Sequence, residues 1–153
     1  MSNITSLPSE RIAIVGNIDP DAYTAATYTT DWVAMKDYFN FMAIVQAGDL
    51  GSSATLDAKL RAATSGAGAG AADITGAAIT QLTQAGTDSN KQAVINFDPS
   101  VLAGTSYTHV QLSMTVGTAT SDAGAILLGI NPRHAPATDN DATTVDSVTT
   151  ATG

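Results

Sequence analysis

The fold of this chain is decided by the stretch ATLDAKLRA, residues 54–62. Alanine or leucine occupies every second position in it, and threonine, aspartate, lysine and arginine stand between them. Successive side chains of a β-strand point to opposite faces, so a period of two predicts a half-buried strand. On a helix Leu56 and Leu60 would share a face with Ala58 opposite, which fits worse. The polar face is expected to meet water or a partner.

Other stretches repeat this pattern. Residues 38–46, YFNFMAIVQ, are dense in aromatic and branched apolar side chains and are compatible with burial on both faces of a sheet. Residues 107–116 alternate again, with Val110, Leu112, Met114 and Val116 on one side. Weaker strand patterns occupy residues 73–82, 91–98 and 125–130. The first of them also fits a short helix, and its threonines favour a strand.

Strands at a spacing of about 10–15 residues, joined by turns rich in Gly, Asp and Ser, indicate an all-β fold. We expect a two-layer β-sandwich, jelly-roll-like, with extended N- and C-terminal arms. An immunoglobulin-like sandwich stays open, because strand order is not visible in the sequence.

The domain organisation follows from changes in composition. Residues 1–31 are expected to form an N-terminal arm with one short strand at Ile12–Val15, because turn formers surround that run. Residues 32–130 are expected to form the β-sandwich core. Residues 131–153 are expected to form an extended C-terminal arm, since its two prolines lack the backbone donor that a central strand needs.

Composition excludes several functions. The net charge is −8 and only six residues are Lys or Arg, too few for a basic patch on nucleic acid or anionic lipid. Charged residues make up 13%, about half of the ~25% that is usual for soluble domains. A surface with few charges loses little hydration energy when a partner covers it. A bias of composition in the source organism would explain the same numbers.

Catalytic and metal-binding patterns are lacking. The two histidines, His109 and His134, have no acidic partner at a recognisable spacing, and no Gly-x-Ser-x-Gly motif or cysteine supplies a nucleophile. Residues 139–141, Asp-Asn-Asp, lack the other ligands of a calcium loop. We therefore expect no enzyme, no catalytic residues, no cofactor and no metal.

A few residues have features of contact residues. Trp32, the only tryptophan, is either a core residue or an interface anchor. Arg133, beside His134, is either solvated or bonded to a neighbour's carboxylate or carbonyl group. The tail is either disordered or ordered over a neighbour, with Val145 and Val148 as anchors.

The pieces YTHVQLS (residues 107–113) and NPRHAP (residues 131–136) are the most distinctive parts of a pattern that extends from Trp32 to Val148. This pattern, about three quarters of the chain, resembles small virion structural proteins of tailed bacteriophages, described as head decoration or cement proteins. The resemblance implies a β-sandwich or jelly roll on the outer capsid surface, at junctions between capsomers, often as a dimer or trimer. It implies no catalytic residues.

The expected function is therefore that of a bacteriophage capsid decoration protein, which binds the shell between major capsid subunits and stabilises the head. The expected partners are the major capsid protein and further copies of the chain. The expected location is the virion head surface after synthesis in the host bacterial cytoplasm, since no signal peptide is visible. A neck or tail protein of the virion is the main alternative. A carbohydrate-binding sandwich is less favoured, because aromatic residues make up only 5%.

Overall fold

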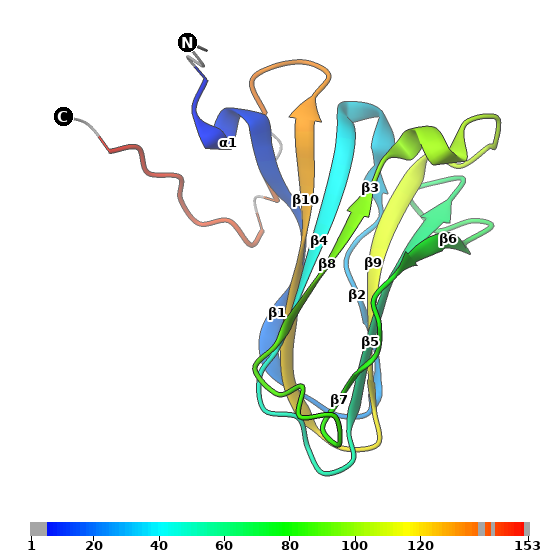
Figure 1. The fold of residues 1–153 in the computed structure, drawn as a ribbon. Coiled ribbons are helices and arrows are strands. Elements are labelled where there is room, and N and C mark those ends of the chain that lie inside the picture. The colour runs from blue at the N-terminus through cyan, green and yellow to red at the C-terminus, as the bar shows by residue number, and fades with distance from the viewer. Residues whose placement is uncertain (1–5, 138–139, 142, 152–153) are drawn as a thin grey trace.

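Two antiparallel sheets pack face to face in the computed structural model, which describes residues 6–137, 140–141 and 143–151 (Figure 1). The short helices are α1 (Pro8–Arg11), η1 (Met35–Asp37) and η2 (Pro99–Leu102). The strands are β1 (Ile12–Tyr23), β2 (Ala26–Thr29), β3 (Val33–Ala34), β4 (Tyr38–Ala47), β5 (Thr55–Ala63), β6 (Ala72–Ala78), β7 (Leu82–Thr83), β8 (Gln92–Phe97), β9 (His109–Gly117) and β10 (Ser121–Pro132). The predicted all-β sandwich is confirmed.

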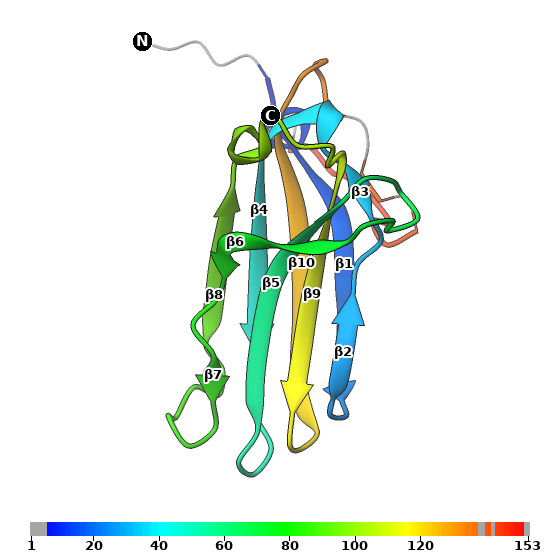
Figure 2. The same ribbon diagram turned by 90° about the vertical axis from the view of Figure 1, so that its right-hand side faces the viewer.

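The first sheet has the strand order β1-β10-β4-β8. The second has the order β2-β9-β5-β6, with β3 also paired to β9 and β7 also paired to β5 (Figure 2). Early strands pair with late ones, β1 with β10, β2 with β9 and β4 with β8. The finer prediction of a jelly roll stays a prediction.

The core lies between the sheets and follows from the alternating patterns. Leu56 and Leu60 of β5 point inward with Leu112 of β9, and all three are fully buried. Phe41 of β4 and Leu127 of β10 meet them from the four-stranded sheet, as members of one apolar cluster. The predictions for residues 54–62 and 107–116 are confirmed. Of the predicted strand at residues 73–82, the part up to Ala78 belongs to β6 and Leu82 begins β7, residues 79–81 lie between these strands, and none of the segment is helical.

The outer face of the six-stranded sheet is polar. Lys59 and Arg61 of β5 reach Asp73 of β6, with N···O distances of 2.7 and 3.4 Å. Asp57 accepts a hydrogen bond of 2.7 Å from the side-chain amide of Gln81. Hydrogen bonding from the Lys59 ammonium lowers the pKa of Asp73 below its ordinary value. Charged side chains thus satisfy one another in water on this face.

The predicted N-terminal arm with one short strand is wrong for residues 12–29. β1 is twelve residues long and forms an edge of the four-stranded sheet, and β2 joins the other sheet. Asn17 and Pro20, which suggested a break in the chain, lie inside β1, where register shifts against β10 occur between Ile14 and Gly16 and between Ile18 and Asp21. An edge strand tolerates proline and bulges, because one side needs no partner. Residues 1–5 of the predicted arm lie outside the described residues.

The boundary of the predicted C-terminal arm is also corrected. β10 runs to Pro132, and the following segment returns to β1: the amide of Ala137 donates to the Glu10 carbonyl at 2.8 Å. The Asp141 amide donates to the Ile14 carbonyl at 2.7 Å, and the Ile14 amide donates to Oδ1 of Asn140 at 2.9 Å. This part of the arm covers the free edge of its own sheet, while residues 138–139, 142 and 152–153 lie outside the described residues.

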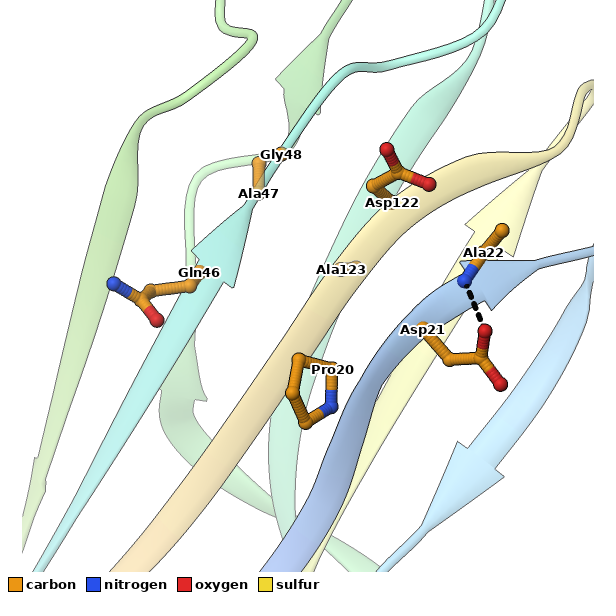
Figure 3. A pocket seen from close by; sticks show the side chains of 9 residues that line it. Pro20, Asp21, Ala22, Gln46, Ala47, Gly48, Asp122 and Ala123 are labelled. Atoms are coloured by element: carbon orange, nitrogen blue, oxygen red, sulfur yellow. Dashed lines mark hydrogen bonds between the residues drawn. The ribbon is translucent and has the colours of Figure 1, made fainter.

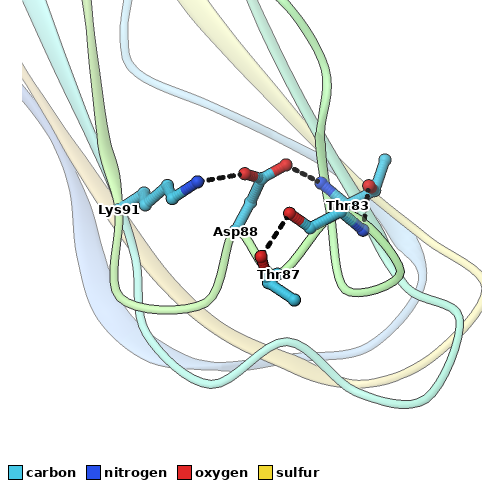
Figure 4. A network of polar contacts seen from close by, with 5 residues as sticks. Thr83, Thr87, Asp88 and Lys91 are labelled. Atoms are coloured by element: carbon cyan, nitrogen blue, oxygen red, sulfur yellow. Dashed lines mark hydrogen bonds and ion pairs between the residues drawn. The ribbon is translucent and has the colours of Figure 1, made fainter.

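The loop that leads into β8 is held by a polar network (Figure 4). The Asp88 carboxylate accepts hydrogen bonds from Nζ of Lys91 at 2.7 Å and from the Thr83 amide at 2.9 Å. Both interactions favour the charged form, and the bond from Lys91 contributes most to lowering the pKa of Asp88 below its ordinary value. The network ties β7 to the first residue before β8.

Replacing Asp88 by asparagine tests this network through its pH dependence. A carboxyl group whose pKa is lower in the folded state stabilises the fold above its ordinary pKa, and this contribution disappears as the pH falls through the folded-state pKa. We expect D88N to lower the Tm at pH 7, with a difference from the original chain that shrinks toward pH 3. Thermal unfolding by circular dichroism at a series of pH values measures it. A difference that is constant with pH would contradict the ionic explanation.

Candidate interaction surface

The outer surface of the four-stranded sheet is aliphatic. We call it the apolar face; its members are Ile12, Ile14, Met42, Ile44, Val94, Ile126, Leu128 and Ile130. Val94 is 54% exposed and Ile12 is 39% exposed, and the other members are half-buried. The described segment at residues 140–141 bonds to the backbone of Ile14 at the β1 edge of this face, and the core lies on the opposite side of the sheet.

Strand register forms these side chains into rows. Ile126 of β10 stands beside Ile44 of β4, and Ile44 stands beside Val94 of β8. Leu128 lies between Met42 and Ile14 in the next row. Directly opposed side chains in an antiparallel pair lie about 4.5–5.5 Å apart at Cβ, so each row is a continuous apolar strip.

The outward positions next to these rows carry amides and no charge: Asn17, Asn40, Gln46, Gln92 and Asn96. The acidic side chains of this sheet lie toward the end of β1 and the start of β10: Asp21 and Asp122 lie beyond Gly124, and Asp19 accepts a hydrogen bond from the Asn17 side-chain amide. Depletion of charge at the centre of a surface is the compositional mark of protein interfaces. The polar, ion-paired outer face of the other sheet has the opposite character.

The size of the apolar face supports a functional role. Four strands about 4.8 Å apart, over about six residues of about 3.4 Å each, give an outer sheet surface of about 400 Å², which includes the amide positions beside the apolar rows. The largest apolar patch of a typical monomer covers about 300–600 Å² and is often functional. A specific interface takes about 800 Å² from each partner, twice this face.

The sequence contained a sign of this surface. Residues 38–46 were compatible with burial on both faces of a sheet, and the structure buries Phe41, Ala43 and Val45 on the inner side only. Met42 and Ile44 on the outer side are equally apolar but lie at the surface. What sequence reasoning missed was that three such strands lie side by side, because that depends on strand order.

Trp32 lies outside the buried core, which excludes the first of the two alternatives for it and leaves the interface anchor as a prediction. It precedes β3 and is half-buried. A Cβ atom added to Gly68 would lie 2.6 Å from Nε1 of Trp32, so the indole packs directly on the glycine-rich loop. The positive φ of 79° at Gly68 also favours glycine. Trp32 covers that loop at the edge of the six-stranded sheet.

Arg133 and His134 follow β10 and are exposed. The guanidinium carbon of Arg133 lies 4.2 Å from the ring centroid of Phe39, a cation–π contact with a side chain that is 50% exposed. The Arg133 amide donates to the Asp37 carbonyl at 2.9 Å. Arg133 thus binds its own chain here, through a ring that the sequence did not indicate.

Val145 and Val148 lie in the last described segment, which runs away from the sandwich in Figure 1. Val145 is half-buried and its amide donates to the Asp141 carbonyl at 2.8 Å. Val148 is 56% exposed. The structure does not bring these valines together with Trp32, and none of the five predicted contact residues belongs to the apolar face.

A hollow between β1, β4 and β10 holds two carboxylates, Asp21 and Asp122 (Figure 3). Their side chains point in different directions, and Asp21 accepts a hydrogen bond of 2.7 Å from the Ala22 amide.

Within the described residues no group of three or more His, Asp or Glu side chains is placed to hold a metal ion. In the same residues no helix is long and apolar enough to cross a membrane.

A second hollow, near the end of β10, contains Lys36, His109 and Arg133. The Nδ1 atom of His109 lies 2.7 Å from the hydroxyl of Thr108, and its other ring nitrogen lies toward Gly66. A histidine that acts as a general base is commonly oriented by a carboxylate that accepts a hydrogen bond from its second ring nitrogen. The side-chain hydrogen-bond partner of the His109 ring is the Thr108 hydroxyl, which is not a carboxylate.

The contact between Trp32 and Gly68 can be tested against a matched glycine. Gly68→Ala and Gly104→Ala both place a Cβ at positive φ, at a cost of about 1–2 kcal/mol each. Only the first collides with a neighbour, since Gly104 has nothing within 4 Å of the added atom. We expect G68A to be the more destabilising in urea unfolding and to shift the emission of the single tryptophan. Equal stability and unchanged emission would contradict the packing.

Neither of two comparisons with known proteins identifies a relative of this chain. No protein-family model matches the chain, and no curated protein matches its sequence. The functional proposal below therefore rests on the geometry of the apolar face.

Proposed function

We propose that the chain is a structural component of a larger assembly, specifically a capsid decoration protein that binds the outer shell of a tailed bacteriophage between major capsid subunits. The observation that carries this proposal is the apolar face. A complete core already lies between the sheets, and these outer aliphatic side chains do not belong to it. Exposed aliphatic rows without charge fit burial against another protein.

The nested strand pairing supports the jelly-roll part of this proposal. When early strands pair with late ones, a long hairpin of chain has been rolled into two sheets, which is how a jelly roll is connected. Viral capsid and lectin domains both use this architecture, so the fold alone selects no function. The resemblance of the sequence to phage head proteins favours the virion.

Cementing a shell needs little energy per copy. A partner that covers a face of this size contributes modestly, but each shell presents the same junction many times, and neighbouring contacts raise the effective concentration of the next. The low charge reduces the hydration lost on binding. A neck or tail role would use the same face at another position on the particle.

A carbohydrate-binding role has less support. Sugar platforms need an open aromatic face, and the exposed ring of Phe39 is already stacked with the guanidinium of Arg133. Tyr23 and Tyr28 contact each other with centroids 4.2 Å apart.

Introducing a positive charge into the apolar face tests the proposal. Ile126→Lys puts an ammonium in the central row, where a partner would have to bury it without a counter-ion. We expect binding to heads that lack the protein to weaken by at least about tenfold, equivalent to about 1.4 kcal/mol. Co-sedimentation with purified heads of the virion whose genome encodes the chain measures this.

Thr115→Lys is the matched control, because it adds the same charge to the outer face of the other sheet, beside Asp57. We expect it to bind heads as the original chain does, and circular dichroism confirms the fold of both variants. If I126K binds as tightly as T115K, the apolar face is not the contact surface. If the original chain binds neither heads nor other virion parts, the decoration role is wrong.

A further inference from the structure

The outer strands of the two sheets differ in how they are protected from pairing with other chains. β1 carries bulges and Pro20, and the segment around Asn140 bonds to its free edge. β2 is only four residues long. β6 has a register shift against β5 and a glycine, Gly76, with a φ of 79°. Bulges, prolines, short length and a covering segment all prevent edge-to-edge association.

β8 has none of these devices. Its six residues, QAVINF, contain no charge, proline or glycine, and it pairs with β4 without a register shift from Gln92 to Phe97. It forms the last strand of the four-stranded sheet, next to the apolar face. A regular, uncharged edge strand of this kind is a template for another strand.

The hydrogen-bond pattern shows which groups of β8 are free of β4. The Ala47 amide donates to the Lys91 carbonyl at 2.9 Å, and bonded pairs alternate along an antiparallel ladder. Ala93, Ile95 and Phe97 therefore direct their backbone groups at β4. The N–H and C=O groups of Gln92, Val94 and Asn96 point to the open side.

We propose that two copies of this chain join by antiparallel pairing of their β8 strands, which forms one continuous sheet of eight strands. A two-fold axis at Val94 satisfies all the free groups. It sets Val94 opposite its own copy, and Gln92 opposite Asn96 of the second copy, which is a pairing of amide with amide. The same patch thus complements itself, as a two-fold interface requires.

Charge favours the antiparallel arrangement. Lys91, whose ammonium also pairs with Asp88 of its own chain, precedes β8, and Asp98 follows it. Antiparallel strands bring the lysine end of one copy to the aspartate end of the other, at both ends of the pair. Parallel strands would place like charges side by side, which is destabilising. Because the rest of β8 is uncharged, the net charge of −8 on each copy opposes this contact little.

The pairing also accounts for the size of the apolar face. Val94 lies in the row of Ile44 and Ile126, so a two-fold axis at Val94 makes the rows of two copies continuous. Two faces of about 400 Å² side by side give about 800 Å², the share of one partner in a standard specific interface. The dimer would therefore present a full-sized surface to the assembly proposed above. Only this last consequence rests on the proposed function.

A proline at Val94 is the sharpest test. Proline removes the N–H that points to the open side, and edge positions tolerate it, whereas Val94→Thr keeps the donor and a branched side chain. The full chain has a mass of 15.5 kDa, and we expect light scattering after gel filtration to give twice this mass for the original chain and for V94T. We expect V94P to give the mass of one chain with an unchanged circular dichroism spectrum. A dimeric V94P, or a monomeric original chain at high concentration, would overturn the pairing.

Hydrogen exchange of the original chain tests the pairing of the two β8 strands even if V94P does not fold. We expect the amides of Gln92, Val94 and Asn96 to be protected in concentrated samples and to lose protection on dilution. The amides of Ala93, Ile95 and Phe97 should stay protected throughout, as they bond to β4. Fast exchange of the first three amides at every concentration would overturn the proposal. These measurements use no capsid, so their failure leaves the head-binding test unaffected, and failure of head binding leaves the dimer standing.

Discussion

The pairing of β10 with β4 is the interaction on which the rest of the structure depends. It joins the two central strands of the four-stranded sheet in unbroken register from Ala47 and Ala123 to Tyr38 and Pro132. Both strands are apolar on both of their surfaces, so the sheet they form is aliphatic on both sides. The chain itself covers one side with its second sheet. The other side is left as the apolar face.

The two sheets are therefore chemically unequal, although both are outer layers of one sandwich. The six-stranded sheet has an apolar inner face and a charged outer face on which Lys59 and Asp73 form an ion pair, as is normal for a sheet with one wet side. The four-stranded sheet has the composition of a sheet covered on both sides. Since a single sandwich supplies only one cover, the second is expected to come from outside the chain. This inequality is the physical basis of the proposed role in an assembly.

The two edges of the four-stranded sheet also differ from each other: one is closed and the other is open. The β1 edge is closed by the chain's own segment at residues 140–141 and interrupted at Pro20. The β8 edge is regular and open, with Val94 at its centre. Native sheets commonly block their edges. Here the unblocked edge lies next to the uncovered apolar face. Face and edge together form the side of the molecule that we propose for contact with other proteins.

The class of fold and most of the strands were predictable from the local order of residues alone. A side-chain period of two is local, so the alternation at residues 54–62 and 107–116 specified both β-strands and which of their faces would be buried. Strand order, register and edges are not local. They depend on how distant segments pair. That pairing places the turn-like residues Asn17 and Pro20 in an edge strand and packs Trp32 on a loop. It also brings Met42, Ile44 and Ile126 together on one open surface. The contact residues predicted from composition missed that surface, because a side chain's exposure depends on which strands lie beside it.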